Sequence, residues 1–261
     1  MFILKNLAFV LTIILSIGII AFGYISYQNK LNDLATNAQT DVTNNNTNSS
    51  NEIIETEESQ SFGGILGDTY ENLESNELKI TFLGSEAIQS SLDEEDNSEN
   101  WPSLLVHTLE NNNLSITYDI VNIGKQTTSE ILNSTDIEVV IDSNPDIIFF
   151  ESLTLNDNSA VLSTEQSEEN LTALLEQLND QLPNAKVIIF PSNPLLDPSF
   201  YLTQIQSLEE FADNNSLLYA NHWQQWPDVT DPQIEEYSKS GILSERGHEE
   251  LATFMEKFLT E

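Results

Sequence analysis

From residue 77 to residue 261, runs that favour β-strands alternate with runs that favour α-helices. The strand-like runs are short, β-branched or aromatic and almost continuously apolar, as in PDIIFFES at 145–152 and KVIIFPSNP at 186–194. The clearest helix-like run is EENLTALLEQLNDQLP at 168–183. Its apolar residues share one helical face: Leu171, Leu174, Leu175, Leu178 and Leu182. This alternation predicts an α/β domain with a parallel sheet.

The continuous apolarity of the strands predicts that both faces of the sheet are covered, because a strand with one face in water alternates polar and apolar residues. Functional sites in such sheets lie at the carboxyl ends of the strands. Four predicted strands end at Leu83, Ile123, Phe150 and Phe190. The residues directly after these four positions are therefore expected to share one edge of the sheet.

The chain carries 8 lysines and arginines against 43 aspartates and glutamates, a formal net charge of −35. Too few cations remain to neutralise phosphates, which argues against a nucleic-acid partner and disfavours docking on anionic headgroups. The absence of cysteine excludes disulfides and a thiolate zinc site. An acidic surface of this kind is typical of proteins that work in high salt or outside the cell.

Residues 1–30 are expected to form an N-terminal transmembrane anchor. The uncharged stretch from Asn6 to Asn29 is long enough for the roughly 20 residues that a membrane helix needs. Lys5 precedes it, Lys30 follows it, and acidic residues then accumulate, which favours a cytoplasmic N-terminus and an outward-facing remainder. The alternative is a signal peptide whose cleavage releases a secreted protein.

Residues 31–76 are rich in Asn, Thr, Ser and Glu and show almost no apolar periodicity, so we expect a disordered acidic linker there. Residues 77–261 are long enough for one domain with its own core. The predicted organisation is an anchor, a linker and one globular domain.

Four segments of this domain resemble the sequence blocks of the SGNH (GDSL-type) hydrolases. They are ITFLGSE at 80–86, VNIG at 121–124, FFESLTLND at 149–157 and SGILSERGHEEL at 240–251. The resemblance spans nearly all of residues 78–259. It implies a three-layer α/β/α SGNH-like domain with flavodoxin-like topology.

In that family the serine of a Gly-Asp-Ser block attacks an ester carbonyl, and the histidine of an Asp-x-x-His block is the base. A block glycine and a block asparagine stabilise the oxyanion. Carried over by resemblance, these two roles fall on Gly124 and Asn156. An Asn-Asp pair is also common in turns, which is the alternative for Asn156 and Asp157.

The first block departs from the family pattern. Aligned strictly, Ser85 takes the aspartate position and Glu86 takes the nucleophile position. Ser85 is a candidate nucleophile if the turn is rotated by one residue, and is otherwise a polar turn residue. Glu86 is a candidate general base, or an acidic residue that favours the start of a helix.

The last block departs as well, because no histidine has an aspartate three residues before it. In the plain register the catalytic histidine falls at Ile242 or Leu243. Glu245 and His248 form an acid-x-x-His pair with glutamate in place of aspartate, and are the candidate substitutes. His107 lies inside a helix-like run and is expected to be structural.

Trp223, Trp226 and His222 are candidates for substrate binding, in a sugar platform with Trp101 and Tyr201. The alternative is that these aromatic side chains belong to the core. An acidic run at 93–100 is either a cation-binding loop or a solvated loop. No metal site and no cofactor are expected, since the phosphate-loop, dinucleotide and HExxH motifs are missing.

Together these features predict a membrane-anchored extracellular ester or acyl hydrolase, with acylated wall or surface glycans as candidate substrates. The alternative is a catalytically inactive SGNH-fold binding or scaffold module at the cell surface. A third possibility is an acid/base pair made of Glu86 and a second carboxylate such as Glu151.

Overall fold

The computed structural model describes residues 62–73, 75, 77–92 and 99–261. The predicted anchor at 1–30, most of the predicted linker and most of the acidic run at 93–100 lie outside these residues. Across the described ranges, no helix is long and apolar enough to cross a membrane.

A parallel five-stranded sheet forms the centre of the domain, in the order β2-β1-β3-β4-β5. This is the flavodoxin-like order of a doubly wound α/β fold. The strands are β1 (Glu77–Gly84), β2 (Ser115–Asn122), β3 (Ile147–Glu151), β4 (Lys186–Phe190) and β5 (Leu218–Tyr219). All four strand pairs are parallel, so the carboxyl ends of the strands meet at one edge.

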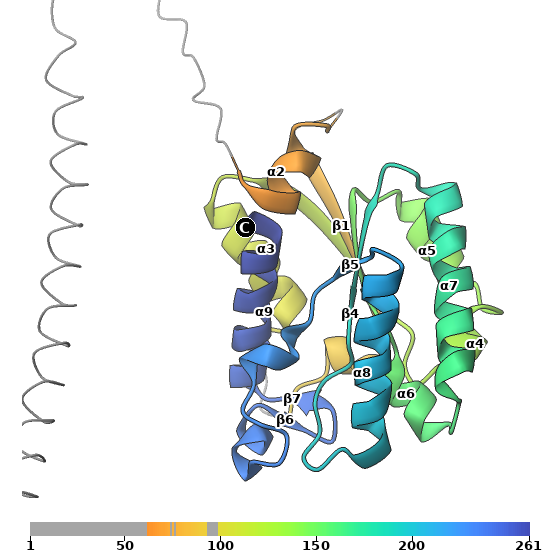
Figure 1. The fold of residues 1–261 in the computed structure, drawn as a ribbon. Helices are drawn as coiled ribbons and strands as arrows, with labels where there is room; N and C mark the ends of the chain where they lie inside the picture. The colour runs from red at the N-terminus through yellow and green to blue at the C-terminus, as the bar shows by residue number, and fades with distance from the viewer. Residues whose placement is uncertain (1–61, 74, 76, 93–98) are drawn as a thin grey trace, which may run out of the picture. The chain divides into compact units, whose positions relative to one another are not determined.

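Helices cover both faces of the sheet, which confirms the predicted three-layer α/β/α arrangement (Figure 1). One face carries α2 (Gly64–Tyr70), α3 (Trp101–Asn111) and α9 (Glu245–Thr260). The other carries α4 (Thr128–Ile131), α5 (Asp136–Ser143), α6 (Thr154–Ser159), α7 (Thr164–Gln181) and α8 (Ser199–Asn214).

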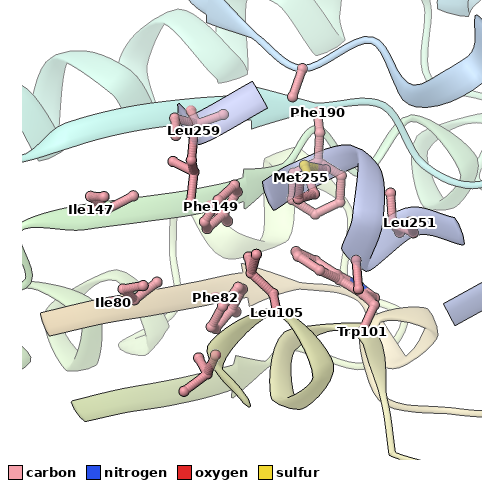
Figure 2. Packing of buried hydrophobic residues seen from close by; sticks show 14 of the residues in the cluster. Ile80, Phe82, Trp101, Leu105, Ile147, Phe149, Phe190, Leu251, Met255 and Leu259 are labelled. Atoms are coloured by element: carbon pink, nitrogen blue, oxygen red, sulfur yellow. The ribbon is translucent and has the colours of Figure 1, made fainter. Parts of the chain in front are cut away.

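Successive side chains of β3 point to opposite faces and so enter two different cores. Ile147 and Phe149 join the core beneath α3 and α9, while Ile148 and Phe150 join the core beneath α7 and α8. In the first core, Trp101 packs edge-on against Phe82, Phe149 and Phe190 (Figure 2). The second core receives the leucine face of α7 that the sequence predicts.

Helix α2 belongs to the compact unit of the domain, although the sequence assigns it to the linker. Leu66 is fully buried in the core beneath α3 and α9, and Phe62, Ile65 and Tyr70 pack against that core. Four apolar side chains within nine residues are enough to dock one short helix, but too few to show a periodic pattern.

Short elements complete the carboxyl edge of the sheet. The turn after β1 continues as the 3-10 helix η1 (Glu86–Ile88). Past β5 come the 3-10 helices η2 (His222–Gln225) and η3 (Pro232–Glu236). An antiparallel pair, β6 (Ser238–Lys239) and β7 (Ile242–Leu243), leads into α9.

Candidate functional site

A cleft of about 760 Å³ opens at the carboxyl edge of the sheet, where parallel α/β folds place their sites. It is lined by Ser85, Glu86, Ala87, Lys125, Thr127, Ser129, Glu130, Leu155, Asn156, Ser159, Ala160, Leu162, Ser240, Gly241 and Ile242. The lining draws on all four family-like blocks or the residues next to them. A second hollow of about 850 Å³, lined by α2 and by strand starts, includes none of these blocks.

The turn after β1 holds Ser85 against a buried carboxylate. The main-chain N–H of Ser85 donates a hydrogen bond to Glu151 Oε2 at 2.7 Å, and its hydroxyl donates to the same oxygen at 2.8 Å. The hydroxyl oxygen also accepts from the Ala87 N–H at 3.3 Å, which caps η1. With 5% of its surface exposed, Ser85 is therefore a structural turn residue in this arrangement.

Glu151 lies at the end of β3 with 3% of its surface exposed. Burial raises the pKa of this carboxyl above its usual value, and hydrogen bonds from Ser192 and Ser85 oppose the rise. Glu151 is not one of the described residues that line the cleft. The acid/base pair of Glu86 and Glu151 is therefore not assembled on the cleft surface.

Glycine is required at position 84 because the backbone passes close to this carboxylate. A Cβ atom there would lie 2.7 Å from Glu151 Oε2, 2.9 Å from Glu151 Cβ and 2.7 Å from Ile88 Cγ2. The carboxylate cannot easily yield, since its hydrogen bonds hold it in place.

We therefore expect Gly84→Ala to lower the free energy of unfolding by about 1–3 kcal/mol, the usual cost of overpacking a core. Urea denaturation of the full chain measures this change. Wild-type stability in the variant would show that the turn and Glu151 relax without cost.

Glu86 is the charged residue that the turn presents to the cleft at the family's nucleophile position. Its carboxylate lies 3.4 Å from Lys125 Nζ, and the two side chains are 44% and 81% exposed. The main-chain N–H of Glu86 donates to the carbonyl of Gly124 at 3.2 Å. The turn therefore holds the largely buried Ser85 against Glu151 and leaves the Glu86 carboxylate partly exposed at the cleft.

The two candidate oxyanion residues have their donors engaged elsewhere. The N–H of Gly124 donates to Asn122 Oδ1 at 2.9 Å. The amide nitrogen of Asn156 donates to the carbonyls of Gln126 at 2.8 Å and Gly124 at 3.3 Å. Asn156 lines the cleft and Gly124 directly precedes the lining residue Lys125, but their donors bind the β2–α4 loop and do not point at a ligand.

Asp157, beside Asn156, belongs to α6 and not to the expected turn. Its carboxylate accepts from the N–H and the hydroxyl of Thr128 and from the hydroxyl of Ser167. It thereby ties α4 to α7 at a fully buried position, and burial raises its pKa.

His248 has no ring nitrogen left for a serine. Its Nδ1 accepts from the main-chain N–H of Trp101 at 3.1 Å, so the proton resides on Nε2, which contacts the carbonyl of Ser90 at 3.3 Å. The ring is fully buried, and burial lowers its pKa. Glu245, the other member of the candidate pair, is exposed at the start of α9. The proposed Ser85, His248 and Glu245 relay is not assembled in this structure.

His222 and Trp226 are buried in the core and the half-buried Trp223 packs against it, so the structure does not present these three side chains as a sugar platform on the cleft. His222 is fully buried, with Nδ1 accepting from Trp226 Nε1 at 2.8 Å and Nε2 lying 2.8 Å from the carbonyl of Pro191. Trp223 Nε1 donates to the carbonyl of Ser192 at 2.8 Å. None of the three lines the cleft.

The expected position of the catalytic histidine holds aliphatic side chains. Ile242 lines the cleft, whereas Leu243 is fully buried in the core beneath α3 and α9. His107 is exposed on α3 and does not line the cleft. Because the chain has three histidines and all of them are described, the cleft contains no imidazole.

The described part of the chain contains no group of three or more His, Cys, Asp or Glu side chains that could hold a metal ion. Among the residues that the structure describes, the charged ones that line the cleft are Glu86, Lys125 and Glu130. Lys125 and Glu130 are the ones that the sequence analysis missed. Lys125 directly follows Gly124, the glycine of the second block. Its place next to a predicted site residue is the sequence feature from which it could have been identified.

Solved structures of GDSL-type hydrolases share this fold. A protein described as a GDSL-like lipase, from Parabacteroides merdae, aligns over 72% of this chain and 97% of its own, with a TM-score of 0.59 and 14% identity. The lipase/acylhydrolase from Enterococcus faecalis aligns over 69% and 94%, with a TM-score of 0.54 and 19% identity. An acetyl xylan esterase aligns over 68% and 98%, with a TM-score of 0.53 and 15% identity.

These likenesses identify the fold as that of the SGNH (GDSL-type) ester hydrolases. Neither a protein-family model nor a curated protein sequence matches the chain. At identities below 20% the structural likeness concerns the fold, and the chemistry must be argued from the cleft itself.

Proposed function

We propose that this chain is a non-catalytic SGNH-fold module that binds a glycan at the cell surface. The observation that carries the proposal is the absence of any imidazole or thiol from the cleft, in a chain whose three histidines are all described and which has no cysteine. Acyl transfer by a serine needs a base that takes the hydroxyl proton and later returns it to the leaving group.

The arrangement of hydrogen-bond donors supports the same conclusion. Ester hydrolysis needs donors aimed at the developing oxyanion. The N–H groups of Ser85, Glu86 and Gly124 and the amide of Asn156 all donate to protein acceptors instead. The cleft keeps the position of the family's active site and lacks the groups that would make it reactive.

A glycan fits the composition of the lining, which includes both hydroxyl-bearing serine and threonine side chains and aliphatic side chains. The volume of about 760 Å³ accommodates a short oligosaccharide. In the proposed arrangement, residues 1–30 anchor the chain in the membrane and the domain faces outward, as the lysine distribution favours.

Ester hydrolysis with Ser85 as nucleophile is the second candidate. It is favoured by the 2.8 Å hydrogen bond from the Ser85 hydroxyl to Glu151, because a carboxylate can act as a general base. Acylated surface glycans would then be substrates. This candidate requires Ser85 to leave its capping position and an oxyanion donor to be released.

The test is turnover of p-nitrophenyl acetate by the full chain in detergent micelles. We expect no hydrolysis above the rate with Ser85→Ala, because the Ser85 hydroxyl is held by Glu151, no imidazole lines the cleft and the candidate oxyanion donors are engaged within the chain. Hydrolysis that Ser85→Ala abolishes would establish the second candidate and overturn the proposal.

A further inference from the structure

Glu86 stands at the nucleophile position of the cleft, and its carboxylate restricts the charge of the ligands that the cleft can bind. A carboxylate at that position repels the carbonyl oxygen of an ester and any anionic group of a ligand. Glu86 is accessible there, with 44% of its side chain exposed. The cleft is therefore suited to a ligand that brings a positive charge to Glu86.

The ion pair that Glu86 makes within the chain is weak enough to be replaced. Its N···O separation to Lys125 is 3.4 Å, longer than the roughly 2.7–2.9 Å of a charge-assisted hydrogen bond. Lys125 is 81% exposed, and solvent-exposed ion pairs of this kind add little stability. A cation held inside the cleft can displace Lys125 towards solvent at little cost.

Other residues that line the cleft also offer hydrogen-bond acceptors. Glu130 accepts from the N–H and the hydroxyl of Thr127, and these hydrogen bonds lower its pKa, so it also stays negative. The hydroxyls of Ser129 and Ser240 line the cleft and make no hydrogen bond within the described part of the chain. An ammonium group has three donors and finds acceptors of both kinds here.

The lining of the cleft also includes the aliphatic side chains of Leu155, Leu162 and Ile242. A sugar ring presents hydroxyls at its edge and C–H groups on its faces, so it matches a cleft whose lining contains both polar and aliphatic side chains. The net charge of −35 on the whole chain further favours the approach of cations over anions.

We propose that the ligand of the cleft is an amino sugar with an unsubstituted, protonated amine, and that Glu86 forms an ion pair with this ammonium group. The inference rests on the proposed glycan-binding function and specifies the chemistry of the glycan. Glu86, which stands where the family has its nucleophilic serine, is then the group that selects the ligand.

The test compares a linear glucosamine trimer with its fully N-acetylated counterpart, which has the same backbone without the charge. Binding to the full chain in detergent micelles is measured by calorimetry at a pH at which the amine is protonated. Wild type is expected to bind the amine form about tenfold more tightly, and Glu86→Gln is expected to abolish this preference.

Glu110→Gln is the matched control, because it removes the same charge from the exposed end of α3, before the start of β2. It should keep the preference, which separates a local ion pair from general attraction to an acidic chain. Equal binding of both trimers by wild type, or equal behaviour of Glu86→Gln and Glu110→Gln, would overturn the amine inference alone. Binding of neither trimer would overturn the glycan-binding function with it.

Discussion

Replacing Glu151 with alanine is expected to lower the free energy of unfolding by about 3 kcal/mol. The side chain accepts from the N–H and the hydroxyl of Ser85, and Ser192 is a further hydrogen-bond partner. The N–H of Ser85 cannot turn to another acceptor, and an unpaired buried donor costs about 1–3 kcal/mol. The missing side chain also leaves a cavity beside Gly84. Urea denaturation of the full chain measures the loss.

Glu151→Gln is the informative partner of this variant, since its carbonyl oxygen can still accept from Ser85 and it carries no charge. Because burial raises the pKa of Glu151 in the folded state, the folded protein holds a proton that the unfolded chain has released. Wild-type stability should therefore fall as the pH rises from about 4.5 through the folded pKa, and Glu151→Gln should lack this component. A Gln variant as unstable as the Ala variant would show that the negative charge itself is needed.

The sheet and most of its helices were predictable from the sequence because their signals are local, whereas α2 was assigned to the linker. The apolar run before Glu151 and the leucine spacing of α7 each lie within one short stretch of sequence. Both appear in the structure as expected. The convergence of the first three blocks at one edge then follows from parallel pairing, whereas the fourth block reaches it through the antiparallel β6–β7 pair.

The roles of individual site residues were not predictable in the same way. Ser85 and Glu151 are 66 positions apart, and Trp101 and His248 are 147 positions apart. Nothing in either local sequence indicates that these groups use each other as hydrogen-bond partners. His222 and Trp226 are only four residues apart. The sequence still could not separate their two possible roles, because a buried aromatic pair and a ligand-binding platform contain the same residue types.

The two departures from the family pattern have one structural consequence. With Glu86 facing the cleft, Ser85 faces the core and its donors are taken by Glu151. With Leu243 in the core, the β6–β7 turn presents Ser240 and Ile242 to the cleft. The same fold thus keeps its cleft while the serine of the first block is buried against Glu151 and aliphatic side chains take the expected position of the histidine.

Acidification is expected to destabilise the protein between about pH 6.5 and pH 4, chiefly through His222. Burial lowers the pKa of this fully buried imidazole to about 4, against an unfolded value near 6.5. In that window the unfolded chain binds a proton that the folded state excludes, so stability is complete above it and is lost as the pH falls. A difference of about 2.5 pKa units corresponds to about 3 kcal/mol. Burial also lowers the pKa of His248, which adds in the same direction.

His222→Gln isolates this effect, because an amide side chain offers one acceptor to Trp226 and one donor to Pro191 and does not titrate. The variant should lose clearly less stability than wild type when urea denaturation is repeated from pH 7 down to pH 4. Above about pH 4.5 the contribution of Glu151 to stability changes with pH in the opposite direction to that of His222. The free energies of unfolding of wild type and His222→Gln are therefore compared with each other at each pH. Parallel curves for wild type and His222→Gln would show that His222 does not set the acid sensitivity, and that its imidazole tolerates protonation through a rearrangement of the Trp226 contact.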